Sequence, residues 1–327
     1  MFFCLLGGRE AGKSYSVMQW AVRRKMRLGD KFKFYWLRLT DAQADKLKKS
    51  GADKLVDPDL KRKYNVNTFT RGDEVFTYTP ITDEETGKEK RIDIKSFCTI
   101  LSCSTMYNCK GVGYFDNEYD GEYCIVLDEM QREAAEKNTF DIVYSFVNML
   151  ENLIRSTKTK VKVIMIGNTL NEASDILSAF NFIPDGFGRY KLKSKRCVVD
   201  YIKPSEKYLA RRKGTAADIV LPNASTFTNE IDIDRSLLVN KRLCQKPQYV
   251  VKFTSDKESW FTVWNDNIIK PYNKEDCRII AMRKYLDEIY DTETMNMVFQ
   301  QFNMRNYRFT NLAVLKRFQK NLKLLKK

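Results

Sequence analysis

The residues best suited to chemistry form a phosphate-binding pattern at the start of the chain. Gly7 is followed by four residues and then by Gly12, Lys13 and Ser14, and the apolar run of residues 2–6 comes directly before it. A buried strand, a glycine-rich turn and a helix that opens at the lysine make up the P-loop, whose backbone N–H groups surround a β-phosphate. The lysine reaches the β- and γ-phosphate oxygens, and the serine hydroxyl is a ligand for Mg²⁺. The spacing therefore predicts a nucleotide site.

The whole loop is expected to contact the nucleotide. Its glycines matter because a Cβ atom would block the close approach of phosphate to the backbone. The role of Arg9 stays open, since it could contact phosphate or pair with an acidic neighbour. The alternative for the stretch is a glycine turn before an ordinary helix. The expected nucleotide-binding residues are Gly7, Gly8, Arg9, Glu10, Ala11, Gly12, Lys13, Ser14 and Tyr15.

A pair of carboxylates follows a second apolar run. Residues 123–127 read Tyr-Cys-Ile-Val-Leu and lead directly into Asp128 and Glu129. With a P-loop in the same chain this is the usual Walker B arrangement, in which Asp128 would complete the Mg²⁺ shell opposite Ser14. Glu129 would polarise the water that attacks the γ-phosphate. Asn168 follows a further apolar run; it would either sense the γ-phosphate and the water or cap a helix.

The chain has no histidine and has eight cysteines without a CxxC pair. Histidine-based triads and general bases are thereby excluded, so any general base must be a carboxylate. A structural zinc site and a disulfide framework are disfavoured, and buried reduced thiols are expected. The guanine-specifying Asn-Lys-x-Asp is also missing, because residues 240–243 read Asn-Lys-Arg-Leu. A small-molecule kinase would require neither Glu129 nor a basic second domain.

Two cations outside these motifs could act on the nucleotide of a neighbouring subunit. An arginine supplied in trans raises the rate of phosphoryl transfer by orders of magnitude. Arg155 ends a predicted amphipathic helix, where its ordinary role is to complement the helix dipole. Lys110 lies in residues 108–121, a stretch rich in glycine, asparagine and aspartate. The residues alone favour the dipole role for Arg155 and give Lys110 no support beyond its location.

Strands and helices alternate through the first part of the chain, which predicts a mainly parallel sheet flanked by helices. Helical periodicity covers residues 14–28, whereas residues 32–39, 97–103 and 162–166 read as strands. Residues 50–96 contain turn signals and short alternating runs, so they are expected to form a β-hairpin excursion from the sheet. The separation of the two motifs fits P-loop ATPases with an extra strand between them. The predicted fold class is therefore α/β.

Three segments are predicted, because the composition changes near residue 191. Residues 1–190 form the P-loop domain, residues 191–224 a basic helical linker and residues 225–327 a smaller α+β domain. In this last domain, strands are expected over residues 225–233, 248–253 and 259–264, the last two as a hairpin, and helices over residues 275–290, 292–303 and 312–325. Residues 1–190 hold 29 Lys/Arg and 27 Asp/Glu, a net of +2, whereas residues 191–327 hold 28 and 15, a net of +13. The excess indicates a polyanion such as nucleic acid, with a solvated basic surface as the alternative.

The remaining expectations concern the tail and the compartment. Residues 312–327 form a basic amphipathic helix that either docks its leucines on the core or binds nucleic acid or a membrane. No stretch approaches the length of a membrane span. No secretory signal precedes the loop, so a soluble intracellular protein is expected.

These motifs resemble one family, the DNA-packaging ATPases (encapsidation proteins) of small podoviruses. The resemblance rests on Gly-Gly-Arg-Glu-Ala-Gly-Lys-Ser over residues 7–14, Phe-Tyr-Trp-Leu-Arg over residues 34–38 and Ile-Val-Leu-Asp-Glu-Met over residues 125–130. It continues, more faintly, through residues 148–155, 166–169, 211–213 and 261–264.

The resemblance implies a ring-forming ASCE motor of the FtsK/HerA and terminase kind, a homo-oligomer expected to be a pentamer. Such a motor attaches transiently to the portal of a viral procapsid in the host cytoplasm and drives double-stranded DNA inward, using ATP and Mg²⁺. A packaging RNA is a further candidate partner. By resemblance, Arg155 matches a trans-acting arginine finger and Lys110 a trans-acting lysine. Residues 225–327 would resemble an RNase H-like nuclease fold that has lost its catalytic acids.

Family members carry residues ahead of the P-loop strand that help to hold the nucleotide, and almost none are present here. The contacts to adenine are therefore unassigned. The expected catalytic residues are Glu129, Lys13, Arg155, Lys110 and Asn168, and the expected metal ligands are Ser14 and Asp128.

The expected function is an ATP-driven translocase that packages double-stranded viral DNA. One alternative is another DNA pump of the FtsK/HerA kind, for plasmid transfer or chromosome segregation. The other is a nucleotide-gated assembly or nucleic-acid-binding protein that does not hydrolyse ATP. The intact Lys13, Asp128 and Glu129 count against this last alternative.

Overall fold

The computed structural model of the chain divides into two compact units. The first comprises Met1–Ile176 and Gly186–Ile231, and the second comprises Leu177–Asp185 and Asp232–Lys327. The structure describes residues 1–8, 10–82, 87–110, 119–131, 140–154, 160–168, 175–180, 182–184, 186–220, 237–238, 249–253, 259–264, 268–271, 292–310 and 312–325.

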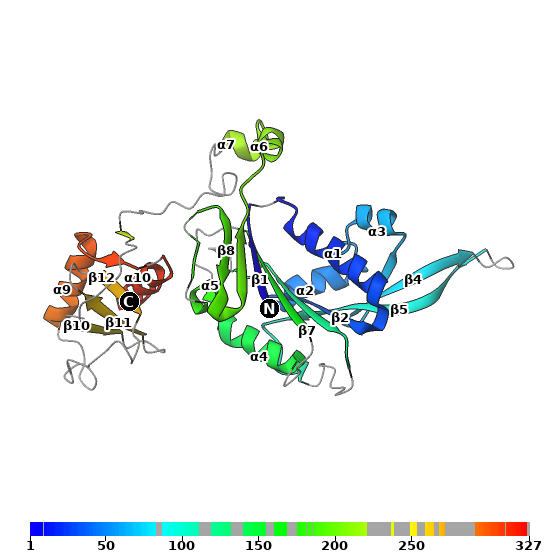
Figure 1. The fold of residues 1–327 in the computed structure, drawn as a ribbon. Helices are drawn as coiled ribbons and strands as arrows, with labels where there is room; N and C mark the ends of the chain where they lie inside the picture. Colours follow the sequence, from blue (N-terminus) through cyan, green and yellow to red (C-terminus); the bar gives the residue numbers. More distant parts are fainter. Residues whose placement is uncertain are drawn as a thin grey trace. The chain divides into compact units, whose positions relative to one another are not determined.

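A nine-stranded sheet runs through the first unit (Figure 1). In spatial order its strands are β3 (Asn67–Arg71), β4 (Glu74–Thr82), β5 (Glu89–Ser102), β2 (Phe32–Arg38), β6 (Glu122–Asp128), β7 (Lys160–Gly167), β1 (Phe2–Leu6), β9 (Cys197–Tyr201) and β8 (Gly188–Leu192). The pairings from β5 through β2, β6, β7 and β1 to β9 are all parallel. Antiparallel pairings join only the strands at the two ends. The predicted mainly parallel α/β sheet is thus confirmed.

Helices cover both faces of this sheet. The helices of the first unit are α1 (Lys13–Leu28), α2 (Asp41–Lys48), α3 (Pro58–Tyr64), α4 (Ile142–Ile154), α6 (Glu206–Arg212) and α7 (Ala216–Val220), with short 3-10 turns η1 (Gly29–Lys31), η2 (Met106–Cys109) and η3 (Lys193–Lys195). The helix α5 (Asp175–Ala179) spans the point where the chain passes between the two units. Figure 1 shows α1, α2 and α3 on one face of the sheet and α4 on the other.

The aromatic strand β2 lies at the centre of the core. Phe32, Phe34 and Trp36 alternate along it, are all buried, and face the apolar sides of α1, α2 and α3. On the other face of the strand, Tyr35 and Leu37 are buried as well. A strand buried on both faces is expected in a parallel sheet, because crossover helices cover both sides.

The predicted hairpin excursion is also confirmed, as an antiparallel meander of β3, β4 and β5. Figure 1 shows β4 and β5 extending beyond the rest of the sheet as a two-stranded ribbon. The guanidinium of Arg91 lies 4.7 Å from the ring centre of Phe69 and 4.9 Å from that of Tyr78. This cation–π contact braces the ribbon.

The structure differs from the predicted domain boundary at residue 190. That residue lies inside β8, and the sheet continues through β9 to Tyr201, so residues 191–201 are not a helical linker. The basic composition is misleading because β8 is an edge strand, and exposed charged residues such as Arg189 and Lys191 are typical of edges. Only α6 and α7 match the helices expected between residues 191 and 224.

The second unit has a four-stranded sheet of β10 (Tyr249–Phe253), β11 (Ser259–Trp264), β12 (Ile268–Pro271) and β13 (Arg308–Phe309), with helices α9 (Thr292–Asn303) and α10 (Leu312–Leu325). The predicted hairpin of β10 and β11 is present. Phe318 of α10 is fully buried, with its ring 5.1 Å from that of Phe261, so the basic tail docks on the core. The strand predicted over residues 225–233 and the helix predicted over residues 275–290 lie outside the described residues. The likeness to an RNase H-like fold stays a prediction.

Within the described residues, no helix combines the length and apolar character that crossing a membrane would require.

The buried position of Phe34 in β2 leads to a prediction about stability. Phe34 is 3% exposed, and its ring lies 5.7 to 6.1 Å from the rings of Phe32, Trp36 and Phe97. Phe34→Ala should lower the free energy of unfolding by about 3–5 kcal/mol, through lost burial and a cavity. Urea unfolding followed by circular dichroism measures this, with Tyr107→Ala, at a side chain 62% exposed, as the neutral control. A loss below about 1 kcal/mol for Phe34→Ala would contradict the packing described.

Candidate nucleotide-binding site

The residues predicted to do chemistry gather at one edge of the sheet. Parallel strands end on the same side, and ligands of such sheets bind outside these carboxyl ends. In the register of the sheet, Leu6 lies opposite Gly167, and Ile166 lies opposite Asp128. Leu37, one residue before the end of β2, lies opposite Leu127. The loop after β1, the carboxylates after β6 and the polar residue after β7 are therefore neighbours.

The loop after β1 has the backbone that a P-loop requires. Its described part includes Glu10, with φ of 61°, and Gly12, with φ of 76°, directly before α1 begins at Lys13. At Gly12 the left-handed conformation favours glycine. The N–H of Gly7 donates to the carbonyl of Gly167 at 3.3 Å, which fixes the start of the loop against β7.

Lys13 is folded back over this loop. Its ammonium Nζ donates to the carbonyls of Gly7 and Gly8 at 2.8 and 2.7 Å, and the residue is 6% exposed. Burial lowers the pKa of Lys13 to about 8, and the charge of Asp128 opposes this shift. The ammonium thus lies in the loop where phosphate oxygens would be bound, held by carbonyl oxygens instead.

Ser14 and Asp128 are in direct contact. The Ser14 hydroxyl donates to Oδ1 of Asp128 at 3.0 Å, across a sequence separation of 114 residues. Burial raises the pKa of Asp128, Arg38 lowers it and Glu129 adds to the rise. A hydroxyl and a carboxylate oxygen at this spacing are hard ligands of the kind that Mg²⁺ takes from proteins. The donor set therefore fits the metal expected from the motifs.

Arg38, the last residue of β2, joins the two carboxylates. Its Nη2 lies 3.0 Å from Oδ2 of Asp128, and its Nη1 lies 2.7 Å from Oε2 of Glu129. Sequence analysis gave this residue no role, although its place at the carboxyl end of a predicted central strand was a usable signal. The guanidinium offsets two negative charges, one of them buried.

Glu129 is placed differently from Asp128. Its backbone has φ of 58°, in the left-handed region, and its side chain is 44% exposed. The next residue, Met130, returns to the sheet by donating its N–H to the carbonyl of Ile166 at 2.9 Å. Glu129 is therefore partly exposed to solvent, whereas Asp128 is buried, although both carboxylates pair with Arg38.

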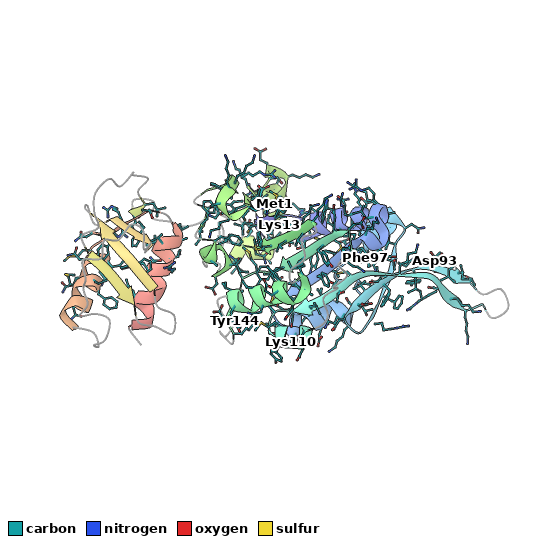
Figure 2. All side chains as sticks on the ribbon, turned by 60° about the horizontal axis from the view of Figure 1, so that its bottom comes forward. Met1, Lys13, Asp93, Phe97, Lys110 and Tyr144 are labelled. Atoms are coloured by element: carbon teal, nitrogen blue, oxygen red, sulfur yellow. The ribbon has the colours of Figure 1, made fainter. Side chains whose placement is uncertain are left out.

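The structure brings only some of the other predicted site residues to this edge of the sheet. Asn168 follows β7 at the same edge and is half-buried, and Tyr15 lies in the first turn of α1. Lys110 is exposed just after η2, and Figure 2 shows it well apart from Lys13. Arg9 and Arg155 lie outside the described residues.

The overall fold has relatives among solved structures of bacteriophage motors. A chain of the bacteriophage Phi-29 viral genome packaging motor assembly aligns with 15% identity over 100% of this chain and 95% of that one, at a TM-score of 0.60. The Phi-28 gp11 DNA packaging motor aligns with 16% identity over 98% and 94%, at a TM-score of 0.58. No protein-family model matches the chain, and no curated protein does. At these identities the likeness shows that the chain has the fold of these motor proteins.

The burial of the Lys13 ammonium leads to a prediction about how the stability of the protein depends on pH. Lys13 has a pKa of about 8 in the folded protein and the ordinary value of about 10.4 when unfolded. Between these pH values the unfolded chain binds more protons, so Lys13 makes the protein more stable as pH rises through this window. From about pH 7.5 to 9.5, the wild type should gain about 2 kcal/mol relative to Lys13→Met in urea unfolding.

The exposed lysine Lys110 provides the control for this experiment, because Lys110→Met should follow the wild type at every pH. An identical pH dependence for wild type and Lys13→Met would show that burial in the loop does not desolvate the ammonium.

The contacts of Arg38 lead to a prediction about stability. Arg38→Ala should lower the free energy of unfolding by about 3–5 kcal/mol, because it leaves the buried Asp128 without its cation. Adding Asp128→Asn to Arg38→Ala should restore part of the loss, with a coupling free energy of about 0.5–3 kcal/mol. A double-mutant cycle by urea unfolding measures the coupling, and simple additivity of the two substitutions would refute the contact.

Proposed function

We propose that the chain is a Mg²⁺-dependent ATPase that drives double-stranded DNA into a viral procapsid. The observation that carries the ATPase proposal is the contact of Ser14 with Asp128 beneath the glycine loop, with Glu129 beside it. The serine at the start of α1 and the carboxylate at the end of β6 are 114 residues apart in sequence, and a shared Mg²⁺ would need this hydroxyl and this carboxylate side by side.

The roles of the residues follow from their positions. Lys13 would exchange the loop carbonyls for the β- and γ-phosphate oxygens, and the loop N–H groups would hold the β-phosphate. Ser14 and Asp128 would hold Mg²⁺, which neutralises charge on the phosphates in the transition state. Glu129, solvated and next to the metal ligand, would orient the attacking water. Asn168 lies at the same edge and would contact the γ-phosphate or that water.

The cations Arg155 and Lys110 would act on the nucleotide of a neighbouring subunit. Lys110 lies apart from Lys13 (Figure 2), so in this proposal it acts on the site of a second copy rather than on that of its own chain. This role requires a homo-oligomeric ring, proposed to be a pentamer, in which each site lies between two subunits.

Double-stranded DNA is the proposed substrate of the motor. The fold is shared with proteins of phage packaging motors, and the chain carries a net charge of +15. Residues 191–220 alone hold nine Lys/Arg against three Asp/Glu, so much of the basic excess belongs to the first unit. Both units would therefore grip the phosphate backbone, without reading sequence.

The cellular setting follows from the same proposal. The ring would attach to the portal of the procapsid in the host cytoplasm, with a packaging RNA as a further partner. The second unit would serve as a DNA-binding domain of vestigial nuclease type.

Glu129→Gln tests the enzymatic part. The substitution should lower DNA-stimulated ATP hydrolysis at least about a hundredfold, because the amide cannot polarise the water, while affinity for a slowly hydrolysed ATP analogue stays within about threefold. Steady-state phosphate release with and without double-stranded DNA gives the rate. Glu151→Gln, at an exposed carboxylate on α4, is the matched control and should keep wild-type activity.

The outcomes separate the alternatives. Wild-type hydrolysis that is indifferent to DNA would contradict translocation, and nucleotide binding without any hydrolysis would favour a nucleotide-gated assembly protein.

A further inference from the structure

A hollow lies beside the glycine loop, at the end of β9. Its cavity volume is about 460 Å³, within the range typical of small-molecule sites. One wall consists of Glu10 and Ala11 from the loop itself. The opposite wall comes from residues 202–211, which lead from β9 into α6.

The sheet holds these two walls together. β9 pairs with β1 in parallel, so that Tyr201 lies opposite Leu6. The next N–H, that of Ile202, donates to the carbonyl of Leu6 at 2.8 Å, one residue before the loop begins. A Cβ atom placed on Gly7 would lie 3.4 Å from Cβ of Ile202, so the isoleucine packs directly against the start of the loop.

An ion pair fixes the far wall as well. Arg212, the last residue of α6, places its Nη1 3.2 Å from Oε2 of Glu10. The Arg212 guanidinium also lies 5.7 Å from the ring centre of Tyr208. The loop and α6 thus hold a defined spacing across the hollow.

The chemistry of the lining is divided between flat apolar surfaces and cations. Ile202, Pro204 and the aromatic Tyr208 supply the apolar part. Lys203, Lys207 and Arg211 supply three positive charges, against the single carboxylate of Glu10, which is already paired. A ligand that suits both parts has a planar ring at one end and anionic or hydroxylic oxygens at the other.

We infer that this hollow receives the base and ribose of the nucleotide whose phosphates occupy the loop. The inference rests on the proposed function, because it takes the β- and γ-phosphates to lie on Lys13. A triphosphate bound there must place its nucleoside half beside the loop, and the hollow shares Glu10 and Ala11 with it. Tyr208 offers its ring to the base, and Lys207 and Arg211 face the ribose hydroxyls. This assigns the contacts to the base that the motifs alone do not assign.

Two ligands separate the nucleoside contacts from the phosphate contacts. Inorganic tripolyphosphate with Mg²⁺ would use the loop alone, whereas ATPγS with Mg²⁺ would use the loop and the hollow. Isothermal titration calorimetry of the full chain gives both dissociation constants. Tyr208→Ala should weaken ATPγS about tenfold, the size expected from loss of a stacked ring, with tripolyphosphate unchanged. Arg211→Ala should weaken ATPγS about threefold.

Two matched variants control for effects on ATPγS binding that do not come from contacts in the hollow. Tyr208→Phe keeps the ring and should bind ATPγS as the wild type does. Lys213→Ala removes an exposed charge just beyond α6 that does not line the hollow, and it should also leave ATPγS binding unchanged. Because Arg211 is exposed, Arg211→Ala tests the inference even where Tyr208→Ala disturbs the packing of α6.

The results distinguish the inference from the proposed function. Variants that bind both ligands like the wild type, or that lose both equally, would overturn the hollow as the nucleoside site while leaving the loop as a phosphate site. A wild-type protein that binds neither ligand would overturn both proposals. A selective loss of ATPγS supports the inference.

Discussion

The parallel pairing of β1 between β7 and β9 is the constraint on which the rest of the first unit depends. It buries Cys4 and Leu6 completely and satisfies the backbone of the strand from both sides. The last residues of the three strands lie opposite one another in the register of the sheet. It follows that the glycine loop must lie next to the end of β7 and to the wall at Ile202. A shift of one residue in this register would bury the opposite side chains of β1 and displace the loop from Asp128.

At this edge of the sheet, charged side chains are present but opposite charges offset one another. Asp128 is 4% exposed, and without Arg38 and Ser14 its ionised form would be strongly disfavoured. Lys13 is desolvated in the same region, which favours its neutral form. A cation with two positive charges and a ligand with several negative ones would suit such a site, because each would compensate a group that burial penalises. The arrangement of these side chains therefore favours the joint binding of a metal and a polyphosphate.

Local sequence patterns predicted much of the fold and of the candidate site. The features that they did not predict depend on pairing between strands far apart in the sequence. The loop, the carboxylate pair and the central strands are each encoded within a few residues, and the structure has all of them. Arg38 could not be assigned from its neighbours in sequence, because its role depends on β2 lying beside β6. The boundary near residue 190 was misplaced for a related reason: charged residues on an edge strand have the composition of a linker. The hollow needs both β9 and α6, and no single motif marks it.

The position of β1 has a consequence for synthesis of the chain. This strand is synthesised before its partners β7 and β9, which end at Gly167 and Tyr201. At roughly 5–20 residues per second, it would wait about 10–40 s for its second neighbour. During that interval an apolar segment, Phe2–Leu6, has exposed backbone on both sides and is open to pairing with other chains. Folding of the first unit is therefore expected to be slow and to finish at the nucleotide site, so that the competence to bind phosphate marks the completion of the sheet.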